Sequence, residues 1–226
     1  MRVCVNTIQT KYDNRVVSHE ATWDVFREVI LQGHVVAEDR IAVKMFNAAE
    51  YRTPDSLVDN ADAVVHDRDT DRTYTRRLKE NVLAVTMLVL DYDGGMSVHE
   101  ACERFKDYEY VAYTSFRHLK DKKTEKFRIV FPLATPISAD GRFTDCDDLI
   151  EGSAWCELTQ ALKEFAGACD PASFRCNQFY YLPVTPKARL DTARVWANSG
   201  AVLDCSSWKR SSLRIPAIVN IVSTRW

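Results

Sequence analysis

The sequence lacks any long apolar run. No stretch approaches the ~18 apolar residues of a membrane span, and the N-terminus carries no apolar run of signal-peptide length. It also lacks C-x-x-C pairs and Cys/His spacings typical of zinc sites. An odd number of cysteines, 7, indicates buried thiols in a reducing compartment. We therefore expect a protein with no membrane partner, located in the cytoplasm of a cell or of a bacterial host cell.

An excess of basic charge is also missing. The chain has 30 Lys and Arg against 32 Asp and Glu, a formal net charge of -2. Because no global positive field would draw it to nucleic acid, such binding requires a local basic groove. Only 7 Gly and 7 Pro occur, with 46% hydrophobic residues and no internal repeat, which excludes a low-complexity chain. At 226 residues the chain suits one large domain or two fused subdomains.

Hydrophobic patterning predicts a mixed α/β (α+β) fold with a hairpin-rich second half. Helices are expected after Thr22, after the capping box of Ser97 and Glu100, and around Trp155. The polar, charge-dense residues 51–80 are expected to form surface loops and short elements. Expected strands lie at residues 1–10, 41–46, 83–93, 110–115, 127–133 and 177–184.

Two carboxylates end the most apolar of these strands, LAVTMLVLDYD. Side chains alternate along a strand, so Asp91 and Asp93 point to one face with their Cα atoms roughly 7 Å apart. Like charges that lose hydration together are unfavourable unless a cation lies between them. Mg²⁺ accepts carboxylates while keeping water and phosphate ligands. We interpret the pair as a metal site; the alternative is a solvated strand end followed by a turn.

The following segments carry groups suited to an anion. Ser115 and His118 follow the strand at 110–115, beside the basic turn HLKDKKTEK. Arg128 lies in an apolar strand, where it must meet an anion or form a structural salt bridge. Asp170 begins DPASFRCNQFYYLP; alone it indicates a turn, but as a third carboxylate it would complete a two-metal site.

In their order and spacing these strings resemble the archaeo-eukaryotic primase superfamily, especially the primase-polymerases of phages and plasmids. The apolar strand ending in D-h-D is similar to LVLDYD, and the Ser/His pair with its following hairpin is similar to TSFRH and KFRIVFPL. The third motif is similar to Asp170 followed by QFYYLP, and the upstream stretch is similar to residues 80–82. The resemblance covers residues 40–190. It departs at S-x-x-H, where the family form is S-x-H.

The resemblance implies a split core, with an N-terminal α/β unit, an RNA-recognition-type (RRM-like) sheet unit and the active site between them. It implies one catalytic domain over residues 1–226: subdomains at about 1–80 and 81–200, and a C-terminal extension at 201–226. Asp91, Asp93 and Asp170 would hold two Mg²⁺ or Mn²⁺ ions, and Ser115, His118 and Arg128 would bind the incoming nucleoside triphosphate. Single-stranded template DNA, a primer and a helicase are the implied partners. Template or phosphate contacts are expected at Lys120, Lys122, Lys123 and Arg175.

Two other functions remain open. LVLDYDGG also resembles the opening of haloacid-dehalogenase-type phosphatases, with Asp91 as nucleophile, Asp93 as acid/base and the pair Asp147-Asp148 as further acids. That interpretation leaves FRIVFPL and DPASFRCNQFYYLP unexplained. A primase-like module that binds DNA or nucleotide without turnover is the second alternative.

Overall fold

The computed structural model describes residues 1–140, 142–143, 150–151 and 153–208. Its helices are α1 (Trp23–Leu31), α2 (Val98–Arg104) and α3 (Ala154–Ala166). Short 3-10 turns η1 to η6 lie at Arg40–Ala42, Pro54–Leu57, Ala61–Ala63, Lys79–Asn81, Pro171–Phe174 and Lys187–Thr192. None of the helices in this part of the chain is long and apolar enough to cross a membrane.

Two sheets carry most of the strands. The six-stranded sheet runs β13 (Tyr180–Tyr181), β4 (Met45–Asn47), β1 (Arg2–Ile8), β2 (Arg15–Thr22), β7 (Arg72–Arg76) and β6 (Val64–Asp67). The five-stranded sheet runs β15 (Val195–Asn198), β9 (Tyr110–Thr114), β10 (Phe127–Ser138), β8 (Val82–Tyr92) and β5 (Ala49–Tyr51). Short pairs join β11 (Arg142–Phe143) to β12 (Ile150–Glu151) and β14 (Val184–Thr185) to β3 (Val35–Val36).

The five-stranded sheet contains the β-α-β unit expected from the sequence. Both β8 and β9 pair antiparallel with β10, so they run parallel to each other, and α2 connects them. Gly94 and Gly95 make the turn after β8 with φ angles of 113° and 81°, a region that favours glycine. The capping box of Ser97 and Glu100 then begins α2. The predicted mixed α/β fold is confirmed.

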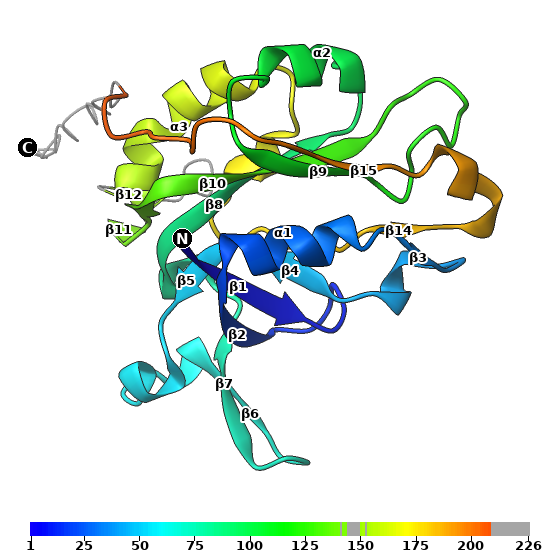
Figure 1. The fold of residues 1–226 in the computed structure, drawn as a ribbon. Coiled ribbons are helices and arrows are strands. Elements are labelled where there is room, and N and C mark those ends of the chain that lie inside the picture. The colour runs from blue at the N-terminus through cyan, green and yellow to red at the C-terminus, as the bar shows by residue number, and fades with distance from the viewer. Residues whose placement is uncertain (141, 144–149, 152, 209–226) are drawn as a thin grey trace, which may run out of the picture.

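The five-stranded sheet lies in the middle of the molecule, with α2 and α3 on one face and α1 with the six-stranded sheet on the other (Figure 1). Side chains alternate along β8, so successive residues pack on opposite faces of the sheet. Leu88 and Leu90 belong to the cluster that includes Phe105 and Leu162. Met87 and Val89 belong to the cluster formed with α1. Asp91 follows Met87 and Val89 at a spacing of two residues, so its side chain lies on the face toward the six-stranded sheet.

Each sheet takes a strand from the other part of the chain. β5 pairs with β8, whereas β13 pairs with β4. A buried amide network lies where these strands cross: the Asn6 side chain donates to Asn47 Oδ1, and Asn47 donates to the carbonyls of Cys176 and Gln178. The two units are thus interlocked, and the proposed division near residue 80 stays a prediction.

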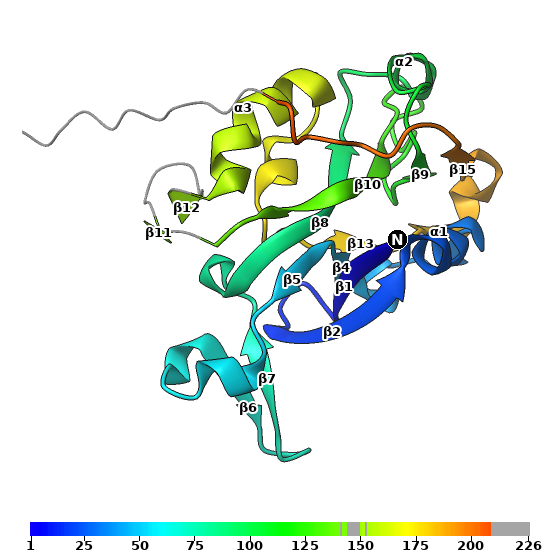
Figure 2. The same cartoon turned by 60° about the vertical axis from the view of Figure 1, so that its left-hand side comes forward.

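Two expected strands differ from the structure. In 41–46 the strand begins only at Met45, because Asp39 accepts a hydrogen bond from the Ile41 N–H and makes a 3-10 turn. In 177–184 two short strands, β13 and β14, flank Pro183, which has no N–H for a ladder. The segment 51–80 forms loops and short elements, as expected, among them the β6–β7 hairpin, which projects from the molecule (Figure 2).

Candidate active site

A cavity of about 190 Å³ opens where β8 and β9 end and β10 begins, between the two sheets. Both Asp91 and Asp93 line it, as the alternation along β8 predicts. Ser115 and Arg128, two of the three expected triphosphate ligands, line it as well. The remaining lining residues are Arg40, Met45, Phe116, Arg117, Gln178, Phe179, Tyr180 and Tyr181.

Asp91 and Arg128 face each other across the β8–β10 ladder. The Arg128 Nη2 atom lies 2.9 Å from Asp91 Oδ2, and the two side chains are 12% and 15% exposed. Within the described residues, the second carboxylate oxygen, Asp91 Oδ1, is buried without a hydrogen-bond partner, as is Arg128 Nε. The ion pair therefore leaves one buried acceptor and one buried donor without a hydrogen-bond partner among the described residues.

Burial raises the pKa of Asp91, and the opposing charge of Arg128 offsets only part of this effect, while Asp93 and Asp170 add to it. For Arg128, burial is the largest single effect and acts against the charge, but the attraction and hydrogen bonding of Asp91 and Tyr113 together outweigh it, and the pKa is raised. The aromatic rings of Tyr113 and Tyr180 lie 5.9 and 5.6 Å from the guanidinium carbon. Arg128 is therefore a fully charged group held in an aromatic, largely dry environment.

Asp93 is more exposed than Asp91. Its carboxylate lies 3.4 Å from Lys126 Nζ, and its side chain is 55% exposed. Lys126, just before β10, and Arg128 are two residues apart and point to the same face, where Lys126 pairs with Asp93 and Arg128 with Asp91. Each carboxylate thus has a cationic partner in the structure, which is the structural salt bridge anticipated as one option for Arg128.

The segment after α3 fixes the backbone of Asp91. The Asp170 N–H donates to the Asp91 carbonyl at 2.8 Å. The Asp91 N–H donates to Ser173 Oγ at 3.0 Å, and Ser173 is 4% exposed. Asp170 and Asp91, far apart in the chain, are therefore adjacent in the fold.

The carboxylate of Asp170 has a local role. It caps η5 by accepting a hydrogen bond from the Ala172 N–H at 2.9 Å. In the described parts of the chain, no three His, Cys, Asp or Glu side chains are grouped closely enough to hold a metal ion. The structure brings together the backbones of Asp91 and Asp170 and the side chains of Asp91 and Asp93. Metal ligation by Asp170 stays a prediction.

Ser115 and His118 adjoin the start of β10. The Ser115 N–H donates to the Lys126 carbonyl at 2.8 Å, and the Nδ1 atom of His118 lies 3.1 Å from both the N and the O atoms of Lys126. Burial lowers the pKa of His118, so its ring is neutral near pH 7. Ser115 lines the cleft, whereas His118 lies behind it, against the backbone of β10.

The predicted DNA contacts do not share one cavity. Lys123 lines a cavity of about 430 Å³ with Gly94 and Gly95, on the far side of the β8 turn. Lys120 and Lys122 are exposed on the same basic turn. Arg175 is exposed and lines a small cavity of about 20 Å³ beside Trp155. Their roles as DNA contacts stay predictions.

Sequence reasoning did not select three basic residues near the site. Arg117 lies in TSFRH, the string that supplied Ser115 and His118, so the sequence could have indicated it as a site residue. Arg40 stacks over the Tyr181 ring at 4.9 Å from the N-terminal side of the cleft, which no local pattern indicates. His34 follows α1, and its Nε2 lies 2.7 Å from the Thr114 carbonyl. With Arg128, the cleft contains three arginines and two aspartates.

The acidic pair expected for a phosphatase, Asp147-Asp148, lies outside the described residues, as does 209–226 of the proposed C-terminal extension. The two segments that a phosphatase leaves unexplained both lie at Asp91. FRIVFPL begins β10 and places Arg128 opposite Asp91. DPASFRCNQFYYLP places Asp170 and Ser173 on its backbone.

Comparison with known proteins gave one structural match. Neither a protein-family model nor a curated protein matches the chain. Among solved structures, the chain is similar to the archaeo-eukaryotic primase domain of the primase-polymerase of cyanophage S-2L, with a TM-score of 0.41 and 10% identity. The similarity covers 90% of this chain and 84% of that one.

Proposed function

We propose that this chain is a primase-polymerase that joins nucleotides on a single-stranded DNA template in the replication of a phage, plasmid or mobile element. One observation carries the proposal. A single cleft between two sheets brings together the acidic pair Asp91 and Asp93 with three arginines, Arg40, Arg117 and Arg128. A site with both charges in a confined space suits a ligand that is anionic and also carries cations, which describes a metal-bound nucleoside triphosphate.

The arginines are suited to the phosphates. A guanidinium presents several donors in a fixed plane and stays charged in a dry site. Arg40 reaches the cleft from the N-terminal part, Arg117 from the loop after β9 and Arg128 from β10. Since they approach from three elements, they can bind different oxygens of one triphosphate. Ser115, in the same cleft, supplies a hydroxyl donor.

The carboxylates fit a hard divalent cation. Asp91 Oδ1 is a buried carboxylate oxygen without a hydrogen-bond partner in the described residues, and Asp93 lies on the same face of the strand. Oxygen donors of this kind are the ligands that Mg²⁺ and Mn²⁺ take. When bound, such cations would lower the pKa of the attacking hydroxyl and neutralise charge on the leaving phosphates. Asp170, adjacent through its backbone, is the proposed third ligand.

The chain's own groups would orient the reaction. The primer 3′-oxygen, or that of the first nucleotide, attacks the α-phosphorus, a new P–O bond forms, and the bond to pyrophosphate breaks as the hydroxyl proton passes to solvent. Arg40, Arg117 and Arg128 would hold the departing pyrophosphate in line. Ser173 and the Asp170 N–H hold the backbone of Asp91 still, so its carboxylate does not have to be ordered during the reaction.

Incorporation of labelled nucleotide on a single-stranded template, with and without primer and with Mg²⁺ or Mn²⁺, tests the proposal. We expect incorporation by the natural chain and its loss, by at least about a hundredfold, in Asp91→Asn and in Asp93→Asn. Glu109→Gln is the matched control. Glu109 is 19% exposed and bonded to Trp23 and Arg27 away from the cleft. That variant should retain activity.

Three results would separate the alternatives. Hydrolysis of a generic phosphomonoester that depends on Asp91, without incorporation, would favour the phosphatase. DNA or nucleotide binding without either turnover would favour the non-catalytic module. Incorporation that survives both aspartate substitutions would place the chemistry elsewhere and overturn the site.

A further inference from the structure

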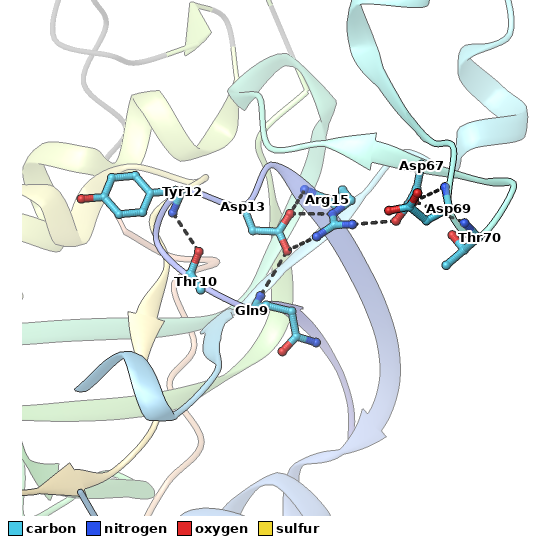
Figure 3. Close-up of polar contacts among 8 residues, drawn as sticks. All are labelled: Gln9, Thr10, Tyr12, Asp13, Arg15, Asp67, Asp69 and Thr70. Carbon is cyan, nitrogen blue, oxygen red and sulfur yellow. Dashed lines mark hydrogen bonds and ion pairs between the residues drawn. The ribbon is translucent and has the colours of Figure 1, made fainter. Parts of the chain in front are cut away.

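A second polar region lies on the six-stranded sheet, outside the cleft that Asp91 and Asp93 line. The turn between β1 and β2 and the β6–β7 hairpin enclose an open cavity of about 550 Å³, lined in part by Tyr12, Arg15 and Arg76. At its margin the Tyr12 side chain is 80% exposed, an unusual state for so large an aromatic group. Figure 3 shows the Tyr12 ring directed away from the neighbouring polar contacts.

The acidic groups of this region are already occupied. Arg15 donates to both carboxylate oxygens of Asp13 and to Asp67, at 2.6 Å, so it ties the β1–β2 turn to the β6–β7 hairpin (Figure 3). Asp67 also accepts from the N–H groups of Asp69 and Thr70. These contacts make a rigid support for the turn that carries Tyr12.

The basic groups of this region are not neutralised in the same way. Lys11 Nζ lies 4.6 Å from the centre of the Tyr12 ring. The Arg76 Nε atom is buried without a hydrogen-bond partner in the described residues. Among the residues that the structure describes, no acidic side chain forms an ion pair with Lys11, Arg76 or Arg77. We call these three residues with Tyr12 the Tyr12 surface.

Arg77 connects the Tyr12 surface to the wall of the candidate active site. Arg77 donates to the Lys11 carbonyl at 3.5 Å and to Asn14 through its backbone N–H at 3.0 Å. Its guanidinium stacks on the Phe179 ring at 4.8 Å, and Phe179 lines the cleft of Asp91 and Asp93. One side chain thus links the exposed tyrosine to the cleft wall.

From this arrangement we infer that the Tyr12 surface binds single-stranded nucleic acid, as the approach path of a strand that enters the cleft. An exposed ring beside cations provides the two contacts that a single strand uses, base stacking and phosphate neutralisation. A duplex hides its base faces and cannot use the ring. The inference rests on the proposed function only for the direction of the strand.

Fluorescence anisotropy with a labelled oligothymidylate, without metal or nucleotide, tests this inference. We expect Tyr12→Ala to weaken binding about tenfold, which is the loss of one stacked base, and Tyr12→Trp to retain it. Lys11→Ala should lower the slope of log affinity against log salt by about 0.7, the contribution of one single-strand phosphate. Val58→Ala removes an apolar group that is 77% exposed elsewhere and should have no effect. Binding of a duplex should not depend on Tyr12.

The outcomes separate this surface from the proposed activity. Equal affinity of Tyr12→Ala and the natural chain, with binding lost instead in Lys122→Ala/Lys123→Ala, would overturn the inference and place the strand on the basic turn. Absence of oligonucleotide binding by the natural chain would also overturn it. If Tyr12→Ala weakens binding but the natural chain incorporates no nucleotide, the surface stands and the polymerase proposal fails.

Discussion

Arg128 and Asp91 form an ion pair across two neighbouring strands at 2.9 Å, with both side chains mostly buried. Neither charge would be stable alone in this position, because burial removes the hydration of each. The pair therefore balances two opposite requirements of the site, an anion for a cationic ligand and a cation for an anionic one. A triphosphate with its metal would supply a new partner to each member.

Substituting one residue of the Arg128–Asp91 pair should destabilise the fold, because the other charge is left buried without a partner. In Arg128→Gln the Asp91 carboxylate loses its cation, and we expect the free energy of unfolding to fall by about 3 kcal/mol, measured by urea denaturation. The double variant Arg128→Gln/Asp91→Asn should recover much of that loss, because no buried charge remains. A single variant as stable as the natural chain would contradict a buried, energetically coupled pair.

Asn47 should act on the cleft through the backbone it holds. Its side-chain amide donates to the carbonyls of Cys176 and Gln178, at the start of the segment 178–181 that lines one wall. We expect Asn47→Ala to lower the free energy of unfolding by about 2 kcal/mol and to raise the KM for nucleotide severalfold, with a smaller effect on kcat. Steady-state incorporation kinetics measure both.

A matched control separates this positioning from simple destabilisation. Asn81 is as buried as Asn47, at 2% against 3%, and its amide also donates to two carbonyls, those of Ala63 and Arg76, away from the cleft. Asn81→Ala should cost similar stability and leave KM unchanged. Equal KM values for the two variants would show that Asn47 is merely structural.

The β8–α2–β9 unit was predictable because its signals are local. An apolar run, a Gly-Gly turn and a capping box lie in sequence order, and each fixes its own stretch of backbone. The shared face of Asp91 and Asp93 follows from strand alternation alone. Arg128 was recognised as a residue that needed an anion, and the structure supplies Asp91 as that partner.

The rest of the site depends on contacts between distant segments. Nothing near Arg40 indicates that a 3-10 turn will place it over Tyr181. The exchange of β5 and β13 between sheets is likewise invisible to periodicity, because each strand has only two or three residues. Asp170 was found by motif, but its use as a cap for η5 is a matter of side-chain direction, which spacing cannot give.

Stability should fall in mild acid because of His34. Burial lowers the pKa of His34 from its ordinary value of 6.5, and the neighbouring His118 lowers it further. Below about pH 6.5 the unfolded chain therefore binds a proton that the folded chain does not, so the free energy of unfolding decreases as pH falls. Urea denaturation across a pH series should show this slope, and His34→Gln should make it shallower. A natural chain whose stability is flat from neutral pH down to about pH 5 would contradict the buried neutral histidine.

The role of Asp170 can be decided by two substitutions that differ in what they keep. Asparagine caps a helical turn about as well as aspartate but carries no charge, whereas alanine does neither. If Asp170 is a metal ligand, Asp170→Asn should keep the stability of the natural chain, as judged by Tm, yet lose most nucleotide incorporation. Asp170→Ala should lose that activity and also about 1 kcal/mol of stability, because the Ala172 N–H is left without its acceptor. Full incorporation by Asp170→Asn would instead show that Asp170 only caps η5 and is not a metal ligand. The cation would then rest on Asp91 and Asp93 alone, since the Asp170 N–H can still support the Asp91 carbonyl in either variant.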